Sequence, residues 1–270
     1  MFAVVLRLEL AQRARIYAAA RAAPYSESYG EPSVVCFRTF GDSAHGNFLA
    51  ASYKAICGNP EWRRRLQKVH TSARRSLPAM EQGRWRELDS CMSSDALLMN
   101  VFCYPRVLAN TELRRALEVE AGGAVQFGFP ARVPLKNGRF DRTEVDLRLG
   151  DLLLEAKLTE VDFQRTPKVR LHAYRDFDKV FDVEGLPQSK QHFDSYQIIR
   201  NVLAAHAGGR SFCVLLDARR PDLMERYYAV LSCVLPVELR TVCRVLTWQE
   251  LAQTLQGKLR AFLSVKYGIE

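Results

Sequence analysis

The stretch TEVDLRLGDLLLEAKL, residues 143–158, most constrains the fold of this chain, because it reads as two short strands around a tight turn. Gly150 and Asp151 form a two-residue loop of the kind that closes β-hairpins, where glycine supplies the positive φ that such turns need. If only these two residues form the loop, Leu149 pairs with Leu152. The pairing register of both strands then follows outward from this pair.

This register separates apolar from charged side chains, because successive residues of a strand point to opposite faces. On the charged face it predicts Asp146 opposite Glu155 and Glu144 opposite Lys157. Like charges directly opposite each other destabilise a sheet, so the two acids call for a compensating group. A divalent cation bound by oxygen ligands is the simplest candidate. The alternative is an ordinary solvent-exposed face, in which Glu144 pairs with Lys157 and Asp146 is tolerated.

Asp146, followed across the hairpin by Glu155-Ala156-Lys157, resembles the PD-(D/E)XK nuclease superfamily, the restriction-endonuclease-like phosphodiesterases. One departure is that Val145 stands where the proline of the motif is expected. The resemblance implies an α/β fold with a restriction-endonuclease-like core, in which helices flank a central mixed β-sheet in the order αβββαβ, here with added N-terminal helices. The neighbouring segments match this order: a helix at 93–102, a strand at 124–129, a helix at 193–205 and a buried strand at 211–217.

The resemblance also implies a site and an activity, a metal-dependent nuclease that hydrolyses DNA. Asp146, Glu155 and the backbone carbonyl of Ala156 would hold Mg²⁺, for which Mn²⁺ could substitute. Lys157 would orient the attacking water or help to deprotonate it, and would offset charge on phosphorus. Glu144, opposite Lys157 in the predicted register, could tune the lysine or merely pair with it. The resemblance also suggests accessory residues: Gln197, which could equally be a helix-surface amide, and Asn100 or Asp95, which could equally be a cap or surface group, with Glu118 or Glu120 as other candidates for the helical acid.

The charge balance of the chain favours a polyanionic partner, with DNA as the expected one. Its 270 residues include 39 Lys and Arg against 30 Asp and Glu, a net charge of +9, and such a surface binds phosphates through counterion release. The densest basic run offers the side chains of Arg63, Arg64, Arg65, Lys68, Arg74 and Arg75. This run is also consistent with a plain solvated helix face. Two alternatives to a nuclease therefore stay open: a catalytically silent nucleic-acid-binding protein of the same fold, and a basic scaffold protein.

The remaining features suggest how the chain is organised. We expect an N-terminal extension over residues 1–30, poorly ordered or helical, and one nuclease-like domain over residues 31–270, with its core at about 90–220. A helix is expected at 110–123, ended by the pair Gly122-Gly123. The seven cysteines are scattered without a CxxC pair, so we expect reduced thiols in a cytoplasmic protein. No apolar run is long enough to predict a membrane span, and a homodimer is compatible with the sequence.

Overall fold

The computed structural model describes residues 1–28, 32–40, 44–69 and 85–270. It divides into two units, of which the first comprises Met1–Ala121 and Trp248–Glu270 and the second Gly122–Thr247. The predicted core at about 90–220 therefore has its first helix in one unit and its strands in the other.

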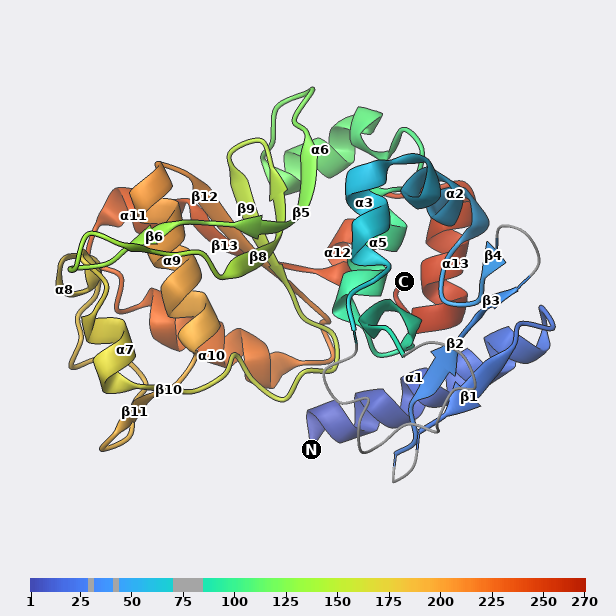
Figure 1. Ribbon diagram of the computed structural model, residues 1–270, viewed down its shortest axis with the longest axis horizontal. Helices are drawn as coiled ribbons and strands as arrows, with labels where there is room; N and C mark the ends of the chain where they lie inside the picture. Colours follow the sequence, from blue (N-terminus) through green and yellow to red (C-terminus); the bar gives the residue numbers. More distant parts are fainter. Residues whose placement is uncertain (29–31, 41–43, 70–84) are drawn as a thin grey trace. The chain divides into compact units, whose positions relative to one another are not determined.

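The second unit is built on a five-stranded mixed sheet (Figure 1). The strands, in the spatial order β13-β12-β9-β8-β5, are β13 (Cys243–Thr247), β12 (Ser211–Leu216), β9 (Leu152–Ala156), β8 (Glu144–Leu149) and β5 (Val125–Pro130). Strands β5, β8 and β9 form an antiparallel meander, while β12 runs parallel to β9 and β13 parallel to β12. The strands predicted at 124–129 and 211–217 and the hairpin between them are thus confirmed.

The hairpin has the predicted register. Leu149 pairs with Leu152, Arg148 with Leu153 and Leu147 with Leu154. Gly150 has a φ of 58°, which is the conformation that a two-residue hairpin loop requires and that glycine adopts without strain. Strand β9 is buried along its whole length, as expected for a strand between two neighbours with both faces covered.

A long crossover joins β9 to its parallel neighbour β12, because parallel strands cannot be joined by a tight turn. It contains β10 (Thr166–Pro167), α7 (Lys168–His172), α8 (Phe177–Val180), β11 (His192–Phe193) and α9 (Tyr196–Gly208). The helix predicted at 193–205 starts later, at Tyr196, because Phe193 pairs with Thr166 and Ser195 has a left-handed conformation. Ile198 and Val202 of α9 are fully buried in the same apolar cluster as Phe212 and Val214 of β12.

The rest of the second unit completes this core. Along the chain, helices α10 (Pro221–Leu231) and α11 (Val237–Thr241) come between β12 and β13. Helix α10 packs against α9 and β13 (Figure 1). A short ribbon of β6 (Val133–Pro134) and β7 (Phe140–Asp141) precedes β8.

The first unit consists mainly of helices. They are α1 (Phe2–Ala19), α2 (Ala50–Gly58), α3 (Pro60–Arg65), α5 (Ser94–Phe102), α6 (Thr111–Leu117), α12 (Trp248–Gln253) and α13 (Gly257–Tyr267). Two ribbons join them, β1 (Tyr25–Glu27) with β2 (Val35–Phe37) and β3 (Thr39–Phe40) with β4 (Ala44–His45). Among the described residues, no helix is long and apolar enough to cross a membrane.

The N-terminal residues are more structured than a poorly ordered extension. Residues 2–19 form α1, which packs against α13 and buries Leu6, Leu10 and Tyr17.

The predicted helix at 110–123 is too long. It ends at Leu117, because Glu118 itself adopts the left-handed conformation (φ 50°, ψ 48°). The backbone N–H of Glu118 then donates to the carbonyl of Arg115, and the N–H of Val119 donates to the carbonyl of Arg114, which closes the helix. Glu118 thus occupies the position that glycine usually takes.

Candidate active site

Glu155, near the end of β9, is the centre of a buried polar cluster. Glu155 is 2% exposed and its neighbour Lys157 is 5% exposed. The ammonium of Lys157 donates to Glu155 Oε1 over 2.6 Å, and the amide of Gln197 donates to the same oxygen over 2.9 Å. The amide of Asn201 donates to Oε2 over 2.9 Å. A solvent-exposed charged face, the alternative for this strand, is therefore wrong for Glu155 and Lys157.

Asp146 joins the cluster from β8. Its side chain is half-buried, and its Oδ2 accepts a 2.8 Å hydrogen bond from the backbone N–H of Ala156. The β8–β9 ladder extends to the pair Leu147–Leu154. Beyond this pair, the side chain of Asp146 replaces a backbone carbonyl of β8 as the acceptor for the N–H of Ala156. On the other side of β9, the N–H of Lys157 donates to Leu215 of β12 over 2.8 Å. The end of β9 is thus held by Asp146 and by β12.

The electrostatics of the cluster keep Lys157 charged. Burial by itself would lower the pKa of the Lys157 ammonium, but the carboxylates of Glu155, Glu160 and Asp146 outweigh burial and hold that pKa above its usual range. A protonated lysine donates hydrogen bonds and accepts none. Lys157 in this state can orient a ligand oxygen or offset negative charge, whereas it cannot take a proton from water.

Helix α9 supplies three of the polar residues, two of which sequence reasoning missed. Gln197 was expected near the site and does contact Glu155. Asn201 was not expected, although it lies four residues after Gln197 and hence on the same helix face. Arg200 was also missed: it is 2% exposed and donates to the carbonyl of Glu144 over 2.7 Å. The residues around the pair Arg200-Asn201, Ile198 and Ile199 before it and Val202 after it, are apolar, so only the spacing from Gln197 to Asn201 could have signalled this face.

Two expected accessory residues, Asp95 and Asn100, make hydrogen bonds within the first unit. Asp95, near the start of α5, accepts bonds from Arg65 over 2.9 Å and from Lys68 over 3.0 Å. Asn100 accepts from the N–H of Leu49 and donates to carbonyls of Asn47 and Ala96. These contacts account for both side chains as structural links within that unit, between α5 and the segments before it.

The other predicted residues that the structure describes differ in their exposure. The side chain of Glu144 is exposed at the start of β8. Arg63 and Arg64 are exposed on α3, while Arg65 and Lys68 are partly buried by their contacts with Asp95. Arg74 and Arg75 lie outside the described residues.

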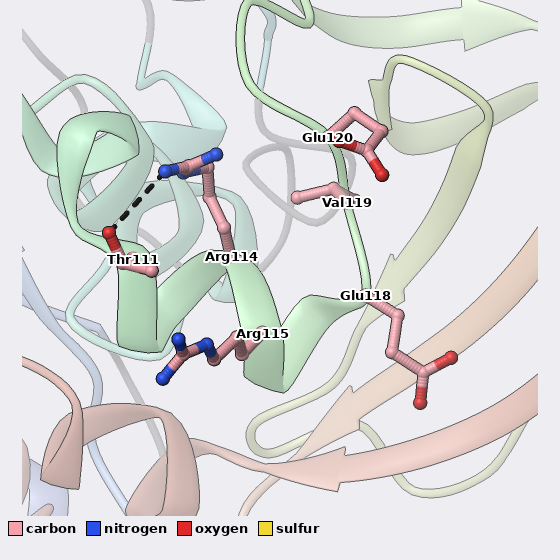
Figure 2. A pocket seen from close by; sticks show the side chains of 6 residues that line it. All are labelled: Thr111, Arg114, Arg115, Glu118, Val119 and Glu120. Carbon is pink, nitrogen blue, oxygen red and sulfur yellow. Dashed lines mark hydrogen bonds between the residues drawn. The ribbon is translucent and has the colours of Figure 1, made fainter.

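Glu118 and Glu120 line a hollow of about 430 Å³ around the end of α6 (Figure 2). Figure 2 shows Arg114 and Arg115 pointing away from each other on this helix, with Arg114 bonded to Thr111 over 3.4 Å. Two arginines and two glutamates give the hollow no excess of either charge. It belongs to the first unit and contains none of the residues around Glu155.

A comparison with known families decides the family of the chain. A family model described as a restriction endonuclease associating with ARP, REase-ARP, matches residues 12–268. This chain belongs to the REase-ARP family. No curated protein and no solved structure matches it. Membership of the REase-ARP family supports a restriction-endonuclease-like fold, to which the mixed α/β architecture with its five-stranded sheet conforms, and it indicates a nuclease-like function that involves nucleic acid.

The REase-ARP chain offers oxygen donors suited to a hard divalent cation. No group of three or more His, Cys, Asp and Glu side chains forms a metal cage in the part of the chain that the structure describes. Mg²⁺, however, is usually bound by one or two carboxylates together with water and substrate phosphate. Glu155 Oε1 already accepts two hydrogen bonds, whereas Oε2 accepts one. A carboxylate oxygen has two lone pairs, so Oε2 keeps one for a further ligand, and Asp146 supplies a second carboxylate.

Proposed function

We propose that this protein is a Mg²⁺-dependent nuclease of the PD-(D/E)XK type that hydrolyses phosphodiester bonds of DNA through Asp146, Glu155 and Lys157. The observation that carries the proposal is the buried Glu155 carboxylate, bound at once by the Lys157 ammonium and by two amides of α9. Burying a charged pair costs several kcal/mol for each ion. A basic scaffold protein has no use for this arrangement, whereas a phosphodiesterase does.

The order of elements supports the same proposal. When the short ribbons and one-turn helices are set aside, the predicted first helix, α5, is followed along the chain by α6, β5, β8, β9, α9 and β12. Asp146 lies on β8, Glu155 lies on β9 and Lys157 directly follows β9, while Gln197 and Asn201 of α9 contact Glu155. Apart from the additional helix α6, this order is compatible with the αβββαβ order that the PD-(D/E)XK resemblance implies.

The residues would share the chemistry as follows. A bound Mg²⁺, held by Asp146, Glu155 and the carbonyl of Ala156, would polarise the scissile phosphate and lower the pKa of a bound water. Lys157, kept protonated by its carboxylate neighbours, would donate to a phosphate oxygen and stabilise the charge that develops on it. Of the two roles expected for Lys157, charge stabilisation is therefore favoured over deprotonation of water.

Exposed basic side chains in the same unit offer a path for the DNA backbone. Arg170, on α7, is exposed and stacks its guanidinium 4.5 Å from the centroid of the Tyr196 ring. Tyr196 directly precedes Gln197, which contacts Glu155. We therefore expect Arg170 to contact phosphates close to the scissile bond, in addition to the exposed Arg63 and Arg64 that the sequence predicts.

The experiment that tests the proposal is cleavage of supercoiled plasmid with Mg²⁺, Mn²⁺ or EDTA. Asp146→Asn is the decisive variant, because Asp146 is only half-buried and its amide analogue keeps the size of the side chain. Asp151→Asn, an exposed substitution in the hairpin turn, is the matched control. We expect metal-dependent cleavage by the wild type and by Asp151→Asn, and a loss of at least 100-fold in Asp146→Asn.

Two results would count against the proposal. Cleavage that survives both EDTA and Asp146→Asn would place the chemistry elsewhere. An absence of cleavage, together with salt-sensitive DNA binding that Asp146→Asn retains, would point to the binding protein of the same fold.

A further inference from the structure

We propose that Arg200 and Asn201 are positioning residues that fix both acidic side chains of the site, Glu155 through a side-chain relay and Asp146 through the start of β8. The inference rests on the proposed nuclease function and extends it to residues that never touch the substrate. A continuous set of hydrogen bonds runs from α9 to both strands of the hairpin.

Arg200 is a fully buried arginine that donates three hydrogen bonds to fixed acceptors. One guanidinium nitrogen donates to the carbonyl of Thr143. The other donates to the carbonyl of Glu144 over 2.7 Å and to Oδ1 of Asn201 over 2.5 Å. Both acceptor carbonyls lie at the start of β8, two and three residues before Asp146. The planar guanidinium thus ties this end of β8 to α9 in a defined geometry.

Asn201 stands between a group that only donates and a group that only accepts. Its Oδ1 receives the Arg200 guanidinium, and its Nδ2 donates to Glu155 Oε2 over 2.9 Å. An arginine has no acceptor and an ionised carboxylate has no donor, so the amide can take only this orientation. Arg200 therefore orients Asn201, and Asn201 with Gln197 orients the Glu155 carboxylate.

An acid other than Glu155 lies within electrostatic reach of Arg200. Burial alone would raise the pKa of Asp141, but hydrogen bonds from Thr143 and Tyr174 and the charge of Arg200 outweigh burial and lower that pKa. Arg200 is linked to Glu155 through a neutral amide, that of Asn201. The relay positions the carboxylate without adding a second cation to it, which leaves Lys157 as its direct ionic partner.

The test compares Asn201→Leu, Arg200→Met and the double variant with the wild-type full chain, with His206→Ala as the control from the exposed end of α9. Three quantities are measured: plasmid cleavage, Mn²⁺ binding by electron paramagnetic resonance without DNA, and thermal unfolding. Loss of a residue that orients a metal ligand typically costs 10–100-fold in metal affinity or activity. We expect such a loss in kcat and in Mn²⁺ affinity for each single variant, with KM for DNA unchanged.

The double variant distinguishes a relay from two separate supports. Residues that act in series give a double variant no worse than the worse single one, whereas independent supports would multiply their losses. Asn201→Leu keeps the test decisive if Arg200→Met fails to fold. A folded Asn201→Leu with wild-type kcat and Mn²⁺ affinity would overturn the inference while leaving the nuclease proposal intact. A wild type that neither cleaves nor binds Mn²⁺ would overturn both.

Discussion

Removing one partner of the Glu155–Lys157 pair should destabilise the second unit severely. The two residues are 2% and 5% exposed and their charged atoms are 2.6 Å apart, and breaking a buried pair of this kind costs about 3–5 kcal/mol. The two oxygens of the Glu155 carboxylate accept three hydrogen bonds, from Lys157, Gln197 and Asn201. In Glu155→Gln only one oxygen remains as an acceptor, and the NH₂ group that replaces the other oxygen must face at least one of these donors. In Lys157→Met, the carboxylate stays buried without its ionic partner.

The assay must report on the unit that contains the pair. All three tryptophans, Trp62, Trp85 and Trp248, belong to the first unit, so urea unfolding should be followed by far-ultraviolet circular dichroism or by hydrogen exchange of the β9 amides. We expect each single variant to lose about 3–5 kcal/mol and the double variant to lose at least about 2 kcal/mol less than the sum. Single losses below about 1 kcal/mol that simply add would refute a buried, coupled pair.

Three further predictions concern other parts of the chain. Glu118→Gly should stabilise the first unit by about 1 kcal/mol, because glycine adopts a left-handed C-cap without the strain that a side chain causes; urea unfolding measures this, and Glu118→Ala should gain nothing. Glu27, whose side chain bonds to Arg15 and Ser33, has a pKa lowered from 4.5 to about 2. The stabilisation of the folded chain by this carboxylate is therefore present above pH 4.5 and lost as the pH falls towards 2. Because the Glu27–Arg15 pair is partly exposed, Glu27→Gln should cost less than about 1 kcal/mol of unfolding free energy at pH 7. The same substitution should cost nothing near pH 2. Arg170→Gln should reduce the salt slope of DNA binding by about 1; an unchanged slope would place the DNA path away from α7.

The hairpin could be predicted from sequence because its determinants are local. Gly150 fixes the turn, and the alternation of apolar and charged residues fixes which side chains share a face, so the pairs from Leu149–Leu152 to Leu147–Leu154 follow. The prediction fails one step further on, where Asp146 accepts the amide of Ala156. On the other side of β9 the next amide, that of Lys157, donates to Leu215 of β12. That contact joins residues far apart in the sequence, which a local pattern does not predict.

The accessory residues show the same limit. An acid near the start of a helix looks identical in sequence whether it serves a site or, like Asp95, binds Arg65 and Lys68. Arg200 was hidden for a different reason, since a basic residue on a helix is usually exposed. Its burial depends on the carbonyls of Thr143 and Glu144 meeting it from another part of the chain. Local patterns thus identify the motif, and only the packing of α9 identifies what holds it.

The field that keeps Lys157 protonated should also attract a second cation. The carboxylates of Glu155, Glu160 and Asp146 together outweigh the burial of that ammonium, and the same negative potential favours a divalent ion bound at Asp146 and Glu155. Because such an ion binds only the folded chain, 10 mM Mg²⁺ at a Kd of 1 mM would stabilise the second unit by about 1.4 kcal/mol. Hydrogen exchange of the β9 amides with Mg²⁺ or EDTA measures this, and Asp146→Asn should abolish it. Stabilisation that persists in Asp146→Asn would place the bound ion outside this cluster.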